Sequence, residues 1–291
     1  MAIHYFRDHV TVHNSRNFGD DINPFLLGAL FHRSIIDSED VCIVGIGTII
    51  NDGLIAKLAR FRRKIVFSSG VGYGPVTPEQ FDDSWRFVCV RGPHSAERLR
   101  LPAERAICDG AVLLSRFFPP VASSQRAGVV FIPHINTSWV SGRVLAGICA
   151  DLGFRYLSPD VDERDFIDGV RHARLVITEA MHGAILADAM RVPWIAVQLC
   201  FHEAFKWRDW FASIDLPYRS APLRPNVWNA PDDARRYLKL PYQLAKCWLM
   251  RSRLRTLAHE AEPLLSRDGL LEARSAQLSE RVDEINRTWW H

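Results

Sequence analysis

Apolar and polar positions follow two different rhythms along the chain. Short runs rich in valine, isoleucine and phenylalanine indicate buried strands, and segments with apolar residues three and four positions apart indicate helices. The predicted strands are residues 3–6, 41–44, 64–68, 86–90, 128–132, 154–157, 175–178 and 194–198. The predicted helices between them are residues 23–32, 52–62, 93–101, 141–152, 160–173 and 181–191.

This alternation of strand and helix predicts an α/β protein whose parallel sheets are covered by helices on both faces. A chain of 291 residues is also longer than one hydrophobic core usually supports, which favours two domains. Proline and serine interrupt the pattern at residues 117–126. We therefore expect Rossmann-like lobes at residues 1–120 and 127–225, and a helical segment at 226–291 that packs back across them.

The composition is that of a globular protein, because 48% of the residues are hydrophobic and 24% are charged. The first residues show no basic region before a long apolar stretch, and no apolar window reaches the ~20 residues of a membrane span. A cytoplasmic location is expected. The six cysteines form no C-x-x-C pair and mostly neighbour Val, Ile or Leu, so reduced, buried thiols are expected rather than disulfides or a metal site.

The formal net charge of +3 is small and no nucleic-acid-binding motif accompanies it, so nucleic acid is not an expected partner. The charge is unevenly distributed: residues 235–259 hold seven Lys or Arg, no acid, and several Leu and Trp. A basic amphipathic segment of this kind can hold the protein peripherally at the inner face of the cytoplasmic membrane. The more common arrangement is a helix with one face on the protein body and a solvated basic face.

Ligands of open α/β sheets bind beyond the carboxyl ends of the strands, so the loops that follow strands are the informative ones. Residues 17–24 place a glycine, Asp20 and Asp21 directly before a predicted helix. Free backbone N–H groups at such a helix start can hold an anion beside Asp20. Capping of the helix by Asp20 or Asp21 would also account for the acidic residues at this position.

Two glycine-rich loops, residues 45–48 and 68–74, follow the next predicted strands. Closely spaced glycines let backbone amides approach a phosphate or carboxylate, and Ser or Thr adds hydroxyl donors. The candidate anion-binding residues in these loops are Gly47, Thr48, Ser69 and Gly70. Neither loop has the G-x-G-x-x-G spacing, so a tight turn is the default explanation for each.

Three longer side chains also stand at strand ends. The guanidinium of Arg91 suits bidentate binding of a carboxylate or phosphate. His134 and His182 titrate near neutral pH and can transfer protons, and His182 stands at a helix start where a phosphate is favoured. Taken singly, the arginine is more often part of an ion pair, and each histidine is more often a hydrogen-bonded structural residue. Asp109, at another strand end, can order Arg91 or cap a turn.

The motifs G-x-x-x-x-G-K-[ST], G-x-S-x-G and H-E-x-x-H are absent, so P-loop, α/β-hydrolase and zincin mechanisms have no anchor. The strand-end loops, in their order, resemble the polysaccharide pyruvyl transferase family, especially its ketal-forming members in bacterial exopolysaccharide and capsule synthesis. The matching pieces are NFGDDIN at 17–23, GIGT at 45–48, SGVG at 69–72, VRGPHS at 90–95, CDGA at 108–111 and TEAMHGAI at 178–185.

The resemblance implies a glycosyltransferase-B-like fold of two Rossmann-like lobes with the active site between them. It also implies transfer of the enolpyruvyl group of phosphoenolpyruvate to sugar hydroxyls, which releases phosphate and forms a pyruvate ketal. The implied acceptor is a lipid-linked oligosaccharide or polysaccharide precursor. Phosphoenolpyruvate enters as a donor substrate, and neither a separate cofactor nor a metal is implied.

By the same resemblance, Arg91 is expected to bind the donor, with Met181 and Gly183 beside it. His182 is expected to act as an acid or a phosphate ligand. His134 is the second expected proton carrier, with Asp20 or Glu179 in reserve. These residues define the expected catalytic and donor-binding site.

One position departs from the family pattern, which has an arginine where this chain has Ala180. Lys206 or Arg208 is expected to supply the missing positive charge at the donor. Two other functions stay open, a nucleotide-sugar-dependent glycosyltransferase of the same architecture and a non-catalytic protein that binds a phospholigand or carbohydrate. Stabilisation of the protein against heat by phosphoenolpyruvate, and not by nucleoside diphosphates, would argue against the glycosyltransferase. Release of phosphate from phosphoenolpyruvate would argue against the non-catalytic binding protein.

Overall fold

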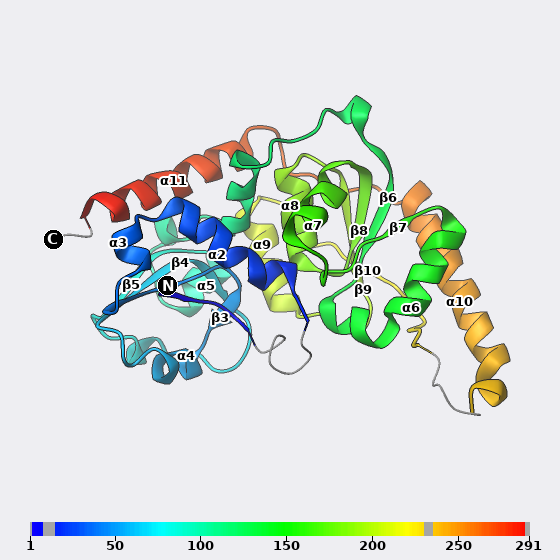
Figure 1. Cartoon of the computed structure of the whole chain (residues 1–291), viewed down its shortest axis with the longest axis horizontal. Coiled ribbons are helices and arrows are strands. Elements are labelled where there is room, and N and C mark those ends of the chain that lie inside the picture. The colour runs from blue at the N-terminus through cyan, green and yellow to red at the C-terminus, as the bar shows by residue number, and fades with distance from the viewer. Residues whose placement is uncertain (1, 8–14, 230–234, 289–291) are drawn as a thin grey trace.

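Two parallel β-sheets and the helices around them form the protein (Figure 1). A computed structural model describes residues 2–7, 15–229 and 235–288, with the side chains of 235–240 left aside. The first sheet has the strand order β1-β2-β4-β3, with β5 also paired to β4, and the second has the order β10-β9-β8-β6-β7. Every strand pair is parallel, which confirms the predicted α/β class with parallel sheets.

The first sheet and its helices come from the first part of the chain. Its strands are β1 (Ile3–His4), β2 (Val41–Val44), β3 (Thr48–Ile50), β4 (Arg63–Val71) and β5 (Trp85–Val90). The α-helices are α2 (Phe18–Leu30), α3 (Arg33–Ile36), α4 (Asp52–Lys57) and α5 (Pro93–Arg98). The 3-10 helices that accompany and follow them are η1 (Pro78–Gln80), η2 (Ala103–Arg105), η3 (Gly110–Arg116) and η4 (Ser123–Gln125).

The second sheet follows η4 along the chain. Its strands are β6 (Ala127–Ile132), β7 (Arg155–Tyr156), β8 (Ala173–Thr178), β9 (Trp194–Gln198) and β10 (Ala221–Pro222). The helices are α6 (Ile135–Leu152), α7 (Glu163–Arg171), α8 (Met181–Ala189), α9 (Ala204–Ser213), α10 (Arg235–Glu260) and α11 (Leu270–Thr288). Helix α10 packs along α6, whereas α11 crosses to the other end of the molecule and packs on η3 and β5 (Figure 1).

The eight predicted strands are all present, because buried β-branched runs leave little choice of conformation. Strands β2 and β9 have the predicted bounds, and the others differ at their ends. The interpretation of residues 45–48 as a turn was incomplete, because β3 begins at Thr48 and pairs with Gly70 of β4. Gly47, at φ +129°, provides the change of direction that lets this short strand join the sheet.

Helix α2 begins at Phe18 rather than at the predicted residue 23. Pro24 hides this start in the sequence, because a proline inside a helix removes the hydrogen bond to the carbonyl four residues earlier. Here the side-chain amide of Asn23 donates to that carbonyl, the one of Asp20, at 2.9 Å. Neither Asp20 nor Asp21 is the N-cap residue as predicted, since both lie in the first turn and Asn17 has that position; the Asp21 carboxylate instead accepts the backbone N–H of Asn17 at 2.7 Å.

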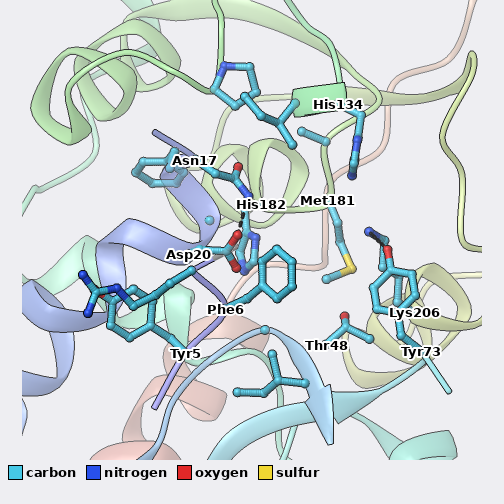
Figure 2. A pocket seen from close by; sticks show the side chains of 18 of the residues that line it. Tyr5, Phe6, Asn17, Asp20, Thr48, Tyr73, His134, Met181, His182 and Lys206 are labelled. Atoms are coloured by element: carbon cyan, nitrogen blue, oxygen red, sulfur yellow. Dashed lines mark hydrogen bonds between the residues drawn. The ribbon is translucent and has the colours of Figure 1, made fainter. Parts of the chain in front are cut away.

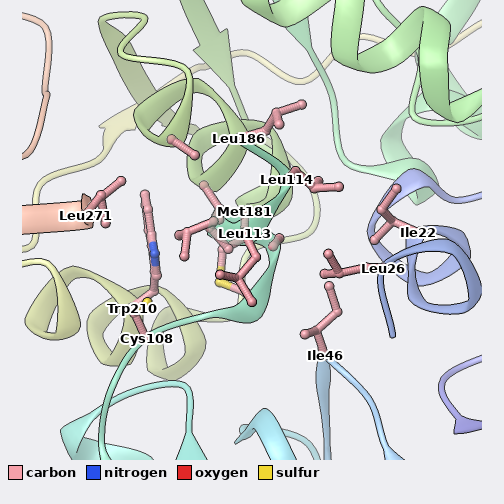
Figure 3. Packing of buried hydrophobic residues seen from close by; sticks show 14 of the residues in the cluster. Ile22, Leu26, Ile46, Cys108, Leu113, Leu114, Met181, Leu186, Trp210 and Leu271 are labelled. Atoms are coloured by element: carbon pink, nitrogen blue, oxygen red, sulfur yellow. The ribbon is translucent and has the colours of Figure 1, made fainter. Parts of the chain in front are cut away.

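A single cluster of buried apolar residues runs through both halves of the molecule (Figure 3). It includes Ile22 and Leu26 of α2, Leu113 of η3, Leu186 of α8 and Leu271 of α11. The short helix η3 packs closely against α8, so it lies where the two sheets with their helices meet. Apolar burial thus fixes the position of α2 relative to α8, two helices that both begin at the cavity described below.

The thiols of Cys42, Cys89, Cys108 and Cys149 are buried as expected. Burial is the main cause that raises the pKa of each of these thiols. Cys200 and Cys247 are only half-buried. Among the described residues, no helix is both long and apolar enough to cross a membrane.

A fully buried ion pair joins the first sheet to helix α9. The guanidinium of Arg91 donates from Nε to Asp209 at 3.0 Å, from Nη1 to the Thr48 hydroxyl at 2.7 Å, and from Nη2 to the Val71 carbonyl at 2.9 Å. Asp209 also accepts from the backbone N–H and the hydroxyl of Ser95, at 2.9 and 2.6 Å. Both charges are therefore compensated inside the protein, which a buried ion pair requires.

We predict that Arg91→Met destabilises the protein by about 3–5 kcal/mol, because it leaves the Asp209 carboxylate buried without its counter-ion. The double variant Arg91→Met/Asp209→Leu should lose less, since neither charge then remains buried. Urea unfolding followed by circular dichroism measures both. Equal losses for the single and the double variant would show that the ion pair does not couple the two elements.

Candidate active site

A cavity of about 680 Å³ lies between the two sheets, at the carboxyl ends of their strands. The loops after β1, β2 and β4 contribute Tyr5, Gly47 and Tyr73 to its lining, and the loops after β6 and β8 contribute His134 and Ala180. Its size is typical of a small-molecule site, for which about 300–1,000 Å³ is usual. The carboxyl-end position is where open α/β sheets bind their ligands.

Three helices direct their N-termini at this cavity. Its lining includes Asn17 and Phe18 at the start of α2, Ile135 at the start of α6, and Met181 and Gly183 in the first turn of α8. A helix N-terminus carries a partial positive charge and free N–H donors, so each of them favours an anion. Ala180 has no side-chain oxygen to cap α8, which leaves the first N–H groups of this helix available to a ligand.

Asp20 places a carboxyl group in the cavity lining, among these helix N-termini. Burial raises the pKa of its carboxyl to about 7, and nearby Asp21 adds to the rise, whereas the amide of Asn17 and the charge of Lys206 oppose it. The side-chain amide of Asn23 ties the underlying helix to the carbonyl and N–H of Ile46, at 3.2 and 2.8 Å. Near neutral pH, Asp20 therefore keeps a substantial protonated fraction and can donate a proton.

His182 lies against the first turn of α2, with its imidazole over Gly19. A Cβ at Gly19 would lie 2.1 Å from Nδ1 of His182, so only a glycine leaves room for the ring there. Burial is the main cause that lowers the pKa of His182, and its other ring nitrogen, Nε2, lies 3.9 Å from Oδ2 of Asp109. The ring is therefore neutral at neutral pH. The buried carboxylate of Asp109 lies close enough to stabilise its protonated form.

The pKa of His134 is too low for the proton carrier expected from the sequence. Burial, Lys206 and His202 lower its pKa to about 3. Its Nδ1 accepts the backbone N–H of Asn136 at 3.3 Å and so caps α6, which leaves the proton on Nε2. His134 lines the cavity as a hydrogen-bond donor, and its expected role as an acid or base has no support in this geometry.

Lys206, in helix α9, supplies a cation on the opposite side of the cavity from Asp20 and His182 (Figure 2). Its ammonium donates to the Tyr73 hydroxyl at 3.0 Å. Arg208, the alternative to Lys206 in the sequence, is exposed on the same helix and lies over the ring of Tyr218 instead. Of the two candidates to replace the arginine missing at Ala180, only Lys206 lines the cavity.

Several expected donor ligands lie behind the cavity wall rather than in it. Arg91 is wholly enclosed by Asp209, Thr48 and Val71, so its guanidinium holds Thr48, which does line the cavity. The guanidinium fills the space beside Gly70, where a Cβ would lie 2.3 Å from its central carbon. The guanidinium does not reach the cavity, so this structure gives no support to the direct contact expected between Arg91 and a donor.

Two further candidates are likewise part of the supporting structure. Ser69 donates its hydroxyl to the Gly45 carbonyl and is buried. Glu179 accepts three backbone N–H groups, from His134, Cys200 and Phe201, at 2.9, 2.9 and 3.0 Å. Its carboxylate therefore joins the ends of three strands, which makes it a poor reserve proton carrier.

Some residues of the site carry weak signals in the sequence. Asp109 was expected to order Arg91 or cap a turn; it does cap η3, through the N–H of Ala111, but its other oxygen faces His182 rather than Arg91. Tyr73 was only a spacer between two glycines. Trp139 lines the cavity, whereas Trp207 and Trp210 are fully buried core residues, the common fate of tryptophan.

Known proteins with related sequences assign the chain to a family. Residues 3–199 match the family described as polysaccharide pyruvyl transferase, and the chain belongs to that family. The chain is 34% identical over 206 residues to the succinoglycan biosynthesis protein ExoV of Rhizobium meliloti (strain 1021). That match covers 70% of this chain and 63% of the relative's length. The family expected from the strand-end loops is confirmed.

Asp20→Asn should become more stable relative to the parent as the pH rises. The raised pKa means that folded Asp20 keeps a proton which the unfolded chain has released between about pH 4 and pH 7, so the parent loses stability as pH rises through this window. The variant cannot titrate there. Between about pH 5 and pH 8 the difference in unfolding free energy should move by about 2–3 kcal/mol in favour of the variant. A pH-independent difference in urea midpoints would place the Asp20 pKa near its ordinary value.

Proposed function

We propose that this protein transfers the enolpyruvyl group of phosphoenolpyruvate to two hydroxyls of one sugar in an exopolysaccharide or capsule precursor. The products are a cyclic pyruvate ketal and phosphate. One observation carries the proposal: the N-termini of α2, α6 and α8 and the Lys206 ammonium converge on a cavity that also holds a protonatable Asp20. A small donor with a carboxylate and a phosphate matches that charge pattern.

The first step needs an acid for the methylene carbon of the donor. Asp20 is the group for this, because burial keeps its carboxyl protonated to about pH 7 although the surroundings are positive. Transfer of its proton converts the methylene into a methyl group and leaves positive charge on the neighbouring carbon. The Asp20 carboxylate formed in this step is then stabilised by the amide of Asn17 and the charge of Lys206.

The second step needs a base for the sugar hydroxyl that attacks that carbon. His182 is neutral at working pH, so it can accept the hydroxyl proton as the new carbon–oxygen bond forms. The imidazolium produced is stabilised by Asp109, whose Oδ2 lies 3.9 Å from Nε2 before the reaction. This assignment gives His182 the role of base, where the sequence alone favoured an acid or a phosphate ligand.

Phosphate then leaves as its bond to the same carbon breaks, and the second hydroxyl of the sugar closes the ketal. Lys206 and the free N–H groups of α8 would hold the departing phosphate, where fixed donors stabilise developing charge. Of the two hydroxyl protons lost by the sugar, one balances the proton on the new methyl group and the other leaves with phosphate. The proposed steps use side chains and backbone of this chain and phosphoenolpyruvate as the donor substrate.

Two all-parallel sheets that direct their strand ends to one cavity support a glycosyltransferase-B-like arrangement of the chain. The cavity is larger than a three-carbon donor needs, which leaves room for an acceptor sugar beside Trp139 and Phe166. A lipid-linked oligosaccharide assembled in the cytoplasm would present its sugar there. A nucleotide-sugar-dependent transferase would share the fold, but the small anionic site and the family favour phosphoenolpyruvate.

We predict phosphate release from phosphoenolpyruvate in the presence of a suitable lipid-linked or synthetic glycan. His182→Ala and Asp20→Asn should each reduce the rate about 10²–10⁴-fold with the fold retained, because each removes one proton transfer. The parent rate should fall above about pH 7, as Asp20 loses its proton. Near-normal turnover of either variant would refute the role given to that residue. Stabilisation by nucleoside diphosphates instead of phosphoenolpyruvate would favour the glycosyltransferase alternative.

Lys206→Met should raise the KM for phosphoenolpyruvate roughly 10–100-fold, because a charge-assisted contact with the donor is lost. Arg208→Met is the matched control, since it removes the same charge two residues away on the exposed side of α9. Steady-state phosphate release at fixed acceptor concentration measures both. Equal effects of the two variants would show that Lys206 acts only through the net charge of the protein.

A further inference from the structure

Helix α10 exposes large apolar side chains to solvent. Tyr242, Leu244, Trp248 and Leu249 are 63%, 61%, 62% and 42% exposed, and they lie within two turns of the helix. Soluble proteins often expose single apolar residues, but a group of four on one helix marks an interaction surface. Tryptophan and tyrosine are the residues that membrane–water interfaces favour.

This exposure does not come from a loosely attached helix. The opposite side of α10 packs along α6, with Met250 and Leu254 fully buried. The ammonium of Lys246 lies 4.3 Å from the ring centre of Trp228 and 4.5 Å from that of Tyr242, which holds both rings at the surface. The apolar surface of α10 therefore has a defined position on a folded support.

The charges of the helix complement an anionic partner. Residues 235–259 include seven Lys or Arg and no Asp or Glu. Arg251 is paired with Asp151 of α6, but Arg253 and Arg255 are exposed in the turn that follows the apolar group. A helix with an apolar outer surface and basic residues beside it binds anionic lipid, because the apolar side chains enter the headgroup region and the cations meet the phosphates.

We propose that the outer face of α10, residues 242–255, binds the surface of an anionic lipid bilayer. The packed-helix interpretation of the sequence accounts for Met250 and Leu254, but not for Leu244 and Trp248, which have no protein partner to cover them in the described part of the chain. Helix α6 lies between α10 and the cavity, to which it contributes Ile135 and Trp139 (Figure 1). A chain bound through α10 would hold this cavity close to the membrane.

Co-sedimentation of the full chain with lipid vesicles tests this proposal without any donor or acceptor, so its result is independent of the proposed activity. The parent should bind vesicles of phosphatidylcholine with phosphatidylglycerol and should bind pure phosphatidylcholine far less. Leu244→Gln/Trp248→Gln, which keeps the charge, should lose at least tenfold in affinity. Circular dichroism and an unchanged unfolding midpoint confirm that this variant is folded.

The electrostatic part is tested by Arg253→Gln/Arg255→Gln, which should weaken binding roughly 30-fold if each cation contributes about 1 kcal/mol. Arg62→Gln/Arg98→Gln removes the same charge from exposed positions on the first-sheet side and should leave binding unchanged. Equal losses in the two charge variants would overturn a specific role for α10. Absence of vesicle binding by the parent would overturn the proposal. A parent dimer that Leu244→Gln/Trp248→Gln converts to a monomer would also overturn it, and would assign this face to a second copy of the chain.

Discussion

The buried ion pair between Arg91 and Asp209 is the constraint on which the site depends. Its two residues are 118 positions apart and come from the two halves of the chain, so the pair fixes how those halves meet. On one side it holds the Thr48 hydroxyl at the cavity, and on the other it anchors α9 one turn from Lys206. A displacement of either charge would move both Thr48 and Lys206, which line the cavity. The arginine thus positions residues of the cavity wall without reaching the cavity itself.

Within this frame, burial shifts the pKa values of Asp20 and His182, the proposed acid and base, in opposite directions. It raises the pKa of Asp20 to about 7 and lowers that of His182, so that a protonated carboxyl and a neutral imidazole coexist near neutral pH. Sites that use one acid and one base need such an arrangement. Gly19 makes it possible, since it brings the start of α2 directly against the imidazole ring. Helix α2, which carries the proposed acid, therefore also shapes the pocket of the proposed base.

Much of the fold followed from the sequence, because buried β-branched strands and their strand-end loops are local patterns. The loops also pointed to Asp20 and His182 as residues of one site, and the departure at Ala180 pointed to Lys206 or Arg208 as its cation. The rest depends on ion pairs and hydrogen bonds between particular side chains, which a sequence pattern does not reveal. Asp209 as the partner of Arg91 and Asp109 as the partner of His182 required the packing of η3 and α9. Pro24 concealed the true start of α2. It cannot donate a hydrogen bond to the Asp20 carbonyl, and the side-chain amide of Asn23 donates to that carbonyl instead.

On the proposed function, a small donor with a carboxylate and a phosphate lies at the helix N-termini between Asp20, His182 and Lys206. A crystal structure of the protein with phosphoenolpyruvate would locate it and so test this placement. The donor phosphate should contact Lys206 and the first turn of α8, with the methylene carbon within reach of the Asp20 carboxyl. Donor density in another part of the molecule, or a pose with the methylene carbon turned away from Asp20, would contradict it.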